Sequence, residues 1–329
     1  GYLKKNYNYF YDIKYKFNIK RIKYFDKFPV GINYYLYSFF SIMISDIRKQ
    51  NLYITRNFFT SFLLSLLKKK HIFEIHDDIL IEGRIVKILL KFFKILNYKT
   101  VIKIITTTKS LKKKYQEYGV IRDKIFVLHN ASSLKSKIKK YRNKKNKLNI
   151  GYLGSIYNSR GIEMIIKLSK IDKLNNYFIY GGSYNQILKI KNKLKNKNIN
   201  FFSHIPYSKV SKKLSRIDVC ILPYTSKITV SGNVGDISNY TSPLKLFDYM
   251  KMGKLIICSN FVKIGCFGLT TLVKPLSSLK RVPSSLRRNK SILKIFLSRL
   301  LIKLRRCFSV PPKLNEPIIN EILIFLFFL

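Results

Sequence analysis

Short apolar runs alternate with amphipathic stretches between residues 52 and 259 of the chain. The apolar runs are flanked by turn-forming residues and predict buried strands. The stretches between them repeat apolar residues at three- and four-residue intervals, as helices do. The predicted strands span residues 52–55, 72–75, 101–106, 124–128, 149–153, 177–180, 199–202, 218–222 and 255–258. Because strands that alternate with helices form parallel sheets covered on both faces, we expect an α/β protein.

A polar run divides this pattern into two series. Residues 132–147 are rich in lysine and have no apolar face, as expected of a linker. We therefore expect a first domain over residues 1–131 and a second over residues 148–329. Residues 1–50 show poor periodicity and lack part of the first strand–helix unit. The tail from about residue 262 is strongly basic and holds no acid before Glu316, and a frameshift in the gene is one explanation for it.

A helix is expected directly after residue 241. Ser242 is a good N-cap, Pro243 suits the first helical position, and Gly253 is expected to end the helix. Its expected core-facing stripe consists of Leu246, Phe247 and Met250. Lys245 lies in the first turn, where a structural helix favours an acid. The free N–H groups of the helix start, together with this lysine, indicate that a phosphate docks there.

A second corner between a strand and a helix spans Gly154–Gly161. Its two glycines allow the backbone to approach a ligand, and Arg160 can hold a phosphate through two parallel hydrogen bonds. Such a loop is structural as often as it binds a ligand. Because this loop lies in the same domain as the helix expected after residue 241, ligand binding is favoured over a purely structural role.

The run Ser242-Pro243-Leu244-Lys245-Leu246-Phe247-Asp248-Tyr249-Met250 resembles the group 1, or GT4-like, class of retaining GT-B glycosyltransferases. Members often show Ser-Pro-x-Lys-(Leu/Met)-Phe-Glu-Tyr-Met, so aspartate replaces glutamate here. The loop at Gly154 resembles their Gly-x(6,7)-Lys-Gly segment, with Arg160 as the basic residue. The resemblance implies two Rossmann-like domains with parallel sheets facing a cleft, the first domain being truncated at its N-terminus. It implies retention at the anomeric carbon and no metal or other cofactor.

The resemblance also assigns roles to individual residues. The residues expected to hold the donor diphosphate are Gly154, Ser155, Arg160, Lys245, Ser242 and Pro243. Those expected near the nucleotide are Gly181, Gly182, His204, Ile205 and Asp248, although Gly181-Gly182 and His204-Ile205 fit plain tight turns equally well. Arg56 and Thr106–Thr108 follow predicted strands and are weaker candidates.

His76 and Asp248 are the expected catalytic residues. His76 follows a predicted strand, as does a histidine near the donor sugar in the family, and we expect Glu74 to point to the opposite face of that strand. Family members often carry a second acid eight residues before Asp248, where this chain has Tyr240. Asp236, in the preceding loop, is a candidate substitute.

The net charge of +48 indicates attraction to anionic surfaces, although AT-rich codons explain much of the lysine. No recognisable motif for RNA or DNA accompanies the charge, so no specific nucleic-acid partner is expected. The uncharged run of residues 28–45 is polar enough to favour a buried or membrane-surface helix over a spanning one. The four cysteines are far apart in the sequence, which favours buried free thiols over a zinc site.

We therefore expect a glycosyltransferase of the hexosyltransferase type (EC 2.4) that uses a nucleoside-diphosphate sugar as donor. The implied acceptor is a cell-envelope polysaccharide or a lipid-linked glycan such as lipopolysaccharide, reached from the cytoplasmic face of the plasma membrane as a peripheral protein. Three alternatives stay open: a GT-B-fold sugar-nucleotide epimerase, an inactive remnant of the fold, and a basic protein that binds membranes or nucleic acid without chemistry.

Overall fold

The structure is a computed structural model of the chain. It describes residues 20, 22, 30–45, 52–78, 84–135, 147–156, 160–192, 194, 196–225, 228–229, 236–240, 242–259, 273–275 and 322–325. The chain splits into two compact units. The N-terminal unit comprises Lys16–Asn130 with Asn239–Ser242, and the C-terminal unit comprises Ala131–Ser238 and the chain from Pro243 onward. Most of the predicted linker, residues 136–146, lies outside the described residues, as does most of the tail from residue 262.

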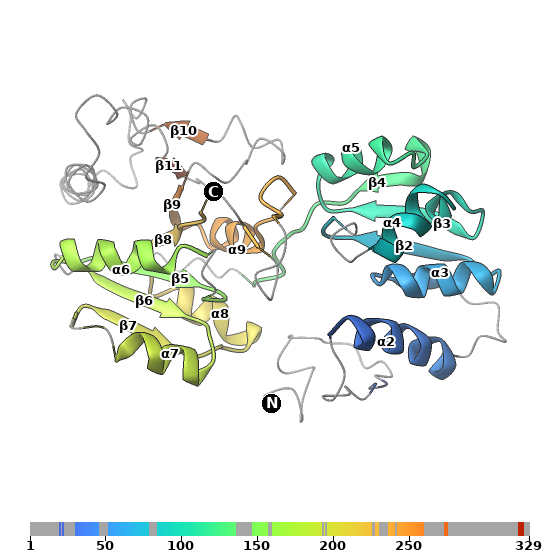
Figure 1. Ribbon diagram of the computed structural model, residues 1–329. Helices are drawn as coiled ribbons and strands as arrows, with labels where there is room; N and C mark the ends of the chain where they lie inside the picture. Colours follow the sequence, from blue (N-terminus) through green and yellow to red (C-terminus); the bar gives the residue numbers. More distant parts are fainter. Residues whose placement is uncertain are drawn as a thin grey trace. The chain divides into compact units, whose positions relative to one another are not determined.

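The N-terminal unit is built on a parallel sheet with the strand order β1-β2-β3-β4 (Figure 1). Its elements are α2 Val30–Ile44, β1 Tyr53–Thr55, α3 Phe58–Leu66, β2 His71–Ile75, α4 Arg84–Lys91, η2 Ile95–Asn97, β3 Val101–Thr106, α5 Lys109–Glu117, η3 Arg122–Lys124 and β4 Ile125–Val127. Local sequence explains two helix starts. The side chains of Asn57 and Thr108 accept hydrogen bonds from the N–H groups of Thr60 and Leu111 at the starts of α3 and α5.

One apolar core holds the N-terminal unit together. It is formed by side chains of the sheet, of α3, α4, α5 and η2, and of the turn after α5: Phe58, Phe73, Ile75, Val86, Leu90, Ile95, Leu96, Val101, Ile104, Leu111, Tyr115, Val120 and Ile125. Burial alternates along β2, so that residues 71, 73 and 75 are buried and the residues between them are half-buried. This period of two sets which side chains of β2 share a face.

The C-terminal unit is built on a sheet in the order β10-β11-β9-β8-β5-β6-β7. Its elements are β5 Asn149–Leu153, α6 Ile162–Ile171, β6 Asn176–Tyr180, α7 Tyr184–Lys191, β7 Ile199–Phe202, α8 Tyr207–Leu214, β8 Val219–Leu222, α9 Leu244–Lys251, β9 Leu255–Ser259, β10 Val273–Pro275 and β11 Ile322–Phe325. Strands β5 to β9 are parallel, whereas β10 and β11 are antiparallel. The strand order reverses between β5 and β8, which is where sheets of this kind bind ligands.

The pattern of apolar runs predicted strands β1 to β9 correctly but did not predict β10 or β11. Each of the nine predicted strands is present, with its ends within one residue of the prediction. Helices α6 and α7 cover one face of the second sheet through a core that includes Ile165, Ile187 and Phe201. The expectation of two parallel α/β sheets is therefore confirmed.

The start of α9 differs from the prediction. The helix begins at Leu244 with Pro243 as its N-cap, and Ser242 does not cap it. Proline has a fixed φ and offers no N–H. With Pro243 as the N-cap, the helix begins one residue later than it would with Ser242 as the N-cap. The helix end is as expected: Gly253 has a φ of 58°, and the N–H of Lys254 donates to the carbonyl of Tyr249 over 3.0 Å.

The buried face of α9 also differs from the predicted stripe. Leu246 and Tyr249 are buried, whereas Phe247 and Met250 are only half-buried. Tyr249 has a reason to turn inward, because its hydroxyl accepts a hydrogen bond from the N–H of Leu153 over 2.9 Å. The prediction of Leu246 was therefore correct, whereas Tyr249 takes the place in the core that was expected of Phe247 and Met250.

Two further predictions concern hydrophobic segments and cysteines. The run at residues 28–45 contains α2, and none of the helices formed by the described residues combines the length and hydropathy needed to cross a bilayer. Cys220 and Cys258 are buried free thiols, as expected, and burial raises the pKa of both. Cys266 and Cys307 lie outside the described residues. No group of three or more His, Cys, Asp or Glu side chains in the described ranges has metal-ligand geometry.

Candidate functional site

The two predicted corners of the C-terminal unit meet where its strand order reverses. Gly161 precedes α6 with a φ of 68°, and a Cβ there would overlap the carbonyl oxygen of Pro223, directly after β8. Gly154 follows β5 with a φ of 144°, and a Cβ there would overlap the side chain of Lys245 from α9. Both positions have a positive φ, so glycine suits the close approach of this loop to Lys245 and to the end of β8.

Lys245 extends from the first turn of α9 across the end of β5. Its Nζ donates a hydrogen bond to the hydroxyl of Tyr152 over 2.7 Å, and it lies 4.5 Å from the centre of that ring and 5.5 Å from the centre of the Tyr224 ring. The residue as a whole is half-buried, but protein atoms enclose its ammonium. Among the described residues, no carboxylate forms an ion pair with it.

Arg160 also lies beside the Tyr224 ring. Its guanidinium carbon is 5.6 Å from the ring centre, so one tyrosine borders both cations. Its Nε is buried and has no hydrogen-bond partner among the residues that the structure describes. Buried donors without partners are uncommon and indicate a group to be bound from outside. Two cations brought together without an ion-paired acid in the described part of the chain are suited to an anion that carries more than one negative charge.

The electrostatics of Lys245 follow from this arrangement. Burial of its ammonium and repulsion by the charge of Arg160 lower the pKa of Lys245 to about 7. Burial also raises the pKa of the neighbouring Tyr152 and Tyr224, so that both hydroxyls stay protonated. An anion placed between the two cations would favour the charged form of Lys245 and raise its pKa again.

This coupling predicts how the binding of a nucleoside diphosphate depends on pH. Above pH 7 the free protein carries neutral Lys245, so binding must take up a proton, and the dissociation constant rises by up to about tenfold per pH unit. Calorimetric titrations between pH 7 and pH 9 measure the slope. Lys245→Arg provides the control, because arginine stays charged throughout and should remove the slope. A wild-type slope of zero would contradict the assignment of Lys245.

Asp248 is held by two hydroxyl groups of its own unit. Ser132 Oγ donates to Oδ1 over 2.6 Å, and the Tyr207 hydroxyl donates to the same oxygen over 2.9 Å. Burial raises the pKa of Asp248, and the two donated hydrogen bonds oppose that rise. The carboxylate is therefore fixed in orientation. Whether it touches a donor sugar stays a prediction.

The other predicted binding residues fall into two groups. Gly181 and Gly182 follow β6 with φ values of 146° and 87°, and a Cβ at either would overlap protein atoms, those of Gly154 or of Ile156. These two glycines thus allow the ends of β5 and β6 to pack together. His204 and Ile205 follow β7, where His204 is exposed and Ile205 half-buried. Their contact with a nucleotide stays a prediction.

Ser155 and Ser242 have different surroundings. The carbonyl oxygen of Ser155 accepts a hydrogen bond from the Tyr152 hydroxyl over 2.7 Å, which ties the glycine-rich loop to the ring under Lys245. Ser242 is grouped with the N-terminal unit, and its hydroxyl is buried without a hydrogen-bond partner in the protein. Pro243, by contrast, belongs to the C-terminal unit.

His76 contradicts the expectation about Glu74. Its Nε2 lies 2.6 Å from Oε1 of Glu74. Residues two apart on an extended strand share a face, so the predicted opposite orientation was wrong. Glu74 therefore orients the imidazole of His76 through this contact. Asp236 is exposed, and its carboxylate accepts hydrogen bonds from the N–H groups of Ile228 and Ser238, which gives it a loop-shaping role.

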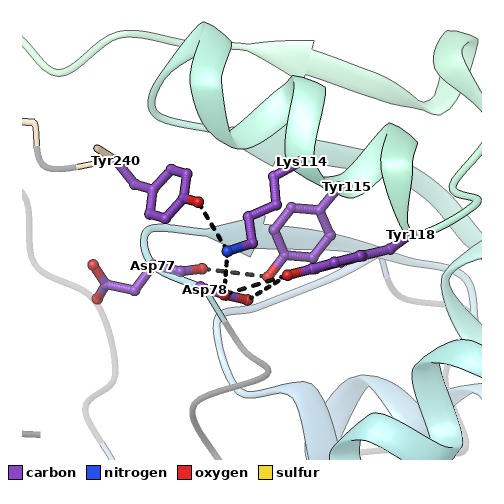
Figure 2. Close-up of polar contacts among 6 residues, drawn as sticks. All are labelled: Asp77, Asp78, Lys114, Tyr115, Tyr118 and Tyr240. Carbon is purple, nitrogen blue, oxygen red and sulfur yellow. Dashed lines mark hydrogen bonds and ion pairs between the residues drawn. The ribbon is translucent and has the colours of Figure 1, made fainter. Parts of the chain in front are cut away.

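A polar cluster that the sequence did not indicate lies at the carboxyl end of β2 (Figure 2). Lys114 Nζ contacts Asp78 Oδ2 at 2.6 Å and donates to the Tyr240 hydroxyl over 2.8 Å. The Tyr115 hydroxyl donates to the carbonyl of Asp77 over 3.3 Å. Burial opposes the charge on Lys114, but the hydrogen bonds to Asp78 and Tyr240 outweigh it and raise the pKa of the lysine. Tyr240 lies in this cluster, and its contact with Lys114 holds Asn239–Ser242 within the N-terminal unit.

The substitution Lys114→Met tests how much this cluster stabilises the N-terminal unit. We expect the free energy of unfolding of the N-terminal unit to fall by about 2 kcal/mol, because the largely buried Asp78 carboxylate loses its lysine. Chemical denaturation measures the change. Lys113→Met is the matched control on the same helix, because Lys113 is exposed. A double-mutant cycle with Asp78→Asn should show coupling of about 1–2 kcal/mol, and additive effects would contradict the pairing.

Several contributors to these sites were not recognisable from the sequence. Tyr152, Tyr224, Ser132 and Tyr207 line the cations or the carboxylate, yet each lies far from its partner along the chain. The weaker candidates are explained by local structure: Arg56 is exposed, Thr108 caps α5, and Thr106 donates to the carbonyl of Phe126 over 3.3 Å. The hydroxyl of Thr107 is buried and has no partner in the protein.

The chain resembles solved proteins in its backbone much more than in its sequence. No protein-family model and no curated protein sequence matches it. It is similar to sucrose-phosphate synthase from Thermosynechococcus elongatus, at 15% identity and a TM-score of 0.53 over 77% of this chain and 65% of that one. A glycosyltransferase from Rickettsia africae matches at 15% identity, with a TM-score of 0.49 over 75% and 67%. The lipopolysaccharide outer core galactosyltransferase WaaB matches at 12%, with a TM-score of 0.45 over 70% and 61%.

The chain thus spans roughly three fifths to two thirds of the length of the structures it matches. At these identities the likeness concerns the fold. The protein has two parallel α/β sheets, and the strand order of the second sheet reverses between β5 and β8. Both features agree with the match in fold to the synthase. The chain has the GT-B fold.

Proposed function

We propose that the protein is a glycosyltransferase whose C-terminal unit holds a nucleoside-diphosphate sugar. One observation carries the proposal: Arg160 and Lys245 border the same tyrosine ring where the strand order reverses, without a carboxylate paired to the lysine among the described residues. A diphosphate supplies the two negative charges that these cations lack. The match in fold to a sucrose-phosphate synthase is consistent with this function.

Each predicted site residue has a role in this function. Arg160 and Lys245 hold the diphosphate, Ser155 and Ser242 supply N–H or hydroxyl donors near it, and Gly154 and Pro243 shape the backbone there. Gly181, Gly182, His204 and Ile205 contribute to the nucleotide side. Asp248 binds the nucleotide or the sugar and steadies positive charge at the anomeric carbon, and His76 is the second catalytic candidate. Because two cations can neutralise the leaving diphosphate, the proposed reaction requires no metal.

The acceptor in this proposal is a cell-envelope polysaccharide or a lipid-linked glycan. The large positive charge favours a protein that works at an anionic membrane surface, and we propose the inner face of the plasma membrane as its location. A GT-B-fold epimerase that rearranges the same donor is the second candidate, because the cation pair would serve it equally well.

Product analysis tests the proposal and separates it from the epimerase. The chain is incubated with UDP-, GDP- and ADP-sugars, first without acceptor and then with a lipid-linked glycan extract. Acceptor-dependent release of a nucleoside diphosphate with a labelled glycan supports a transferase. Rearranged or free sugar without acceptor supports an epimerase instead. Absence of any turnover, together with absence of nucleotide binding, would overturn the proposal.

A further inference from the structure

Helix α4 exposes an apolar stripe that the fold of the N-terminal unit does not use. Val86 and Leu90 anchor the helix in the core, at 1% exposure each. Ile85, Ile88 and Phe92 follow at i, i+3 and i+7, and their exposed fractions are 54%, 47% and 80%. This spacing places the three side chains on one side of the helix. The N–H of Phe92 still donates to the carbonyl of Ile88 over 2.9 Å, so the helical turn continues to that residue.

Basic side chains accompany the stripe. Lys87, Lys91 and Lys94 are all exposed, and the sequence holds no acid between residues 84 and 97. Phe93, at 58% exposure, extends the apolar surface past the end of the helix. A helix that combines large exposed apolar side chains with a row of lysines has the composition of helices that lie in the interface of a membrane.

Helix α2 provides a contrast within the same unit. It also exposes apolar side chains, among them Phe39 at 52% and Met43 at 66%. Its sequence, however, contains no charged residue. Exposed apolar surface is therefore not confined to α4, but the combination with lysines distinguishes α4 from α2.

We propose that α4, with Phe92, Phe93 and Lys94, docks the protein on an anionic lipid bilayer. Lysines on the helix attract anionic headgroups, while Ile85, Ile88 and Phe92 enter the boundary between headgroups and acyl chains. A second copy of the chain is a poorer occupant, because it brings the same lysines and a net charge of +48. This inference rests on the proposed function and deepens it by naming the surface that would meet a membrane-bound acceptor.

Tryptophan fluorescence tests the docking directly, because the chain contains no tryptophan. Phe92→Trp places one reporter on the stripe, and Phe39→Trp places a matched reporter on α2. With vesicles of phosphatidylglycerol and phosphatidylcholine, the emission at position 92 should shift to shorter wavelength and be quenched by brominated lipid. Position 39 should not respond. No shift at position 92, or an equal shift at position 39, would overturn the proposal.

Co-sedimentation with the same vesicles separates α4 from the general charge of the protein. The variant Ile85→Gln/Ile88→Gln/Phe92→Gln should bind about 100-fold more weakly, because three apolar side chains no longer leave water. Lys87→Gln/Lys91→Gln/Lys94→Gln should lose a similar factor on anionic vesicles. The control Lys167→Gln/Lys170→Gln/Lys173→Gln removes three exposed lysines at α6 and should change binding little. Equal losses in both lysine variants would refute a specific role of α4.

Two further readouts distinguish lipid docking from self-association and from RNA binding. Sedimentation velocity without lipid should give the same species for the wild type and the apolar-stripe variant, and loss of a dimer would assign the stripe to a second copy instead. Binding of single-stranded RNA that depends on the stripe, without vesicle binding, would also overturn the proposal. Thermal stabilisation by nucleoside diphosphates should be unchanged in the stripe variant, so that failure of docking and failure of the proposed function give different results.

Discussion

Replacing Arg160 by alanine is expected to weaken the binding of a nucleoside diphosphate by about 100-fold. Arginine contributes a full charge and paired N–H donors, and truncating a charged partner of this kind costs about 2–4 kcal/mol. Its Nε is buried and has no hydrogen-bond partner among the described residues, so a bound diphosphate can accept from it. Isothermal titration calorimetry with UDP, GDP and ADP measures the loss.

The control for this substitution is Arg216→Ala. Arg216 is exposed in the same unit, next to β8, so its removal changes the net charge equally. Arg160→Lys should restore part of the affinity, because the charge returns without the fork of N–H groups. If Arg216→Ala reduced the affinity as much as Arg160→Ala, general charge rather than a specific contact would explain binding.

Gly161→Ala is expected to destabilise the C-terminal unit by roughly 4 kcal/mol. A Cβ at this position would overlap the carbonyl oxygen of Pro223, which is backbone and cannot rotate away. Overpacking costs about 1–3 kcal/mol, and a left-handed residue with a side chain costs a further 1–2 kcal/mol or so. Urea denaturation monitored by circular dichroism measures the loss. The same shift should separate the ends of β5 and β8 and reduce diphosphate binding.

The substitution Gly253→Ala separates the cost of the left-handed backbone conformation from the cost of overpacking. Gly253 also has a positive φ, of 58°, but a Cβ there would meet no atom within 4 Å. It should therefore cost only the backbone contribution of about 1–2 kcal/mol. Equal losses for Gly161→Ala and Gly253→Ala would show that the close contact of Gly161 with the end of β8 contributes nothing to stability, against the arrangement described for the site.

The sequence predicted the strands because their information is local. Apolar runs such as residues 149–153 and 219–222 are bounded by polar turns, and the alternation with helices left one class of fold. The corner at Gly154–Gly161 was also found locally, since glycine tolerates the conformations that the turn needs. The start of α9 was misjudged because Ser242 and Pro243 each favour a helix start, and the proline decided the outcome.

Contacts between side chains that lie far apart along the chain were harder to predict from the sequence. Ser132 and Asp248 lie 116 positions apart, and Lys114 and Tyr240 lie 126 apart, so no local pattern joins them. Tyr152 was counted as a strand residue, although its hydroxyl and ring receive Lys245. The pairing of Glu74 with His76 could have been foreseen, because residues two apart on a strand share a face. The joining of β11 to β9 depends on a contact across the whole tail.

The most direct measurement compares a nucleoside diphosphate with the corresponding monophosphate by calorimetry, in the wild type and in Arg160→Ala/Lys245→Met. We expect the wild type to bind the diphosphate at least about tenfold more tightly, because the second phosphate meets the second cation. In the double variant this preference should vanish while the protein stays folded. Equal affinity of the wild type for both nucleotides, or a preference that survives in the double variant, would contradict the assignment of Arg160 and Lys245 to a diphosphate.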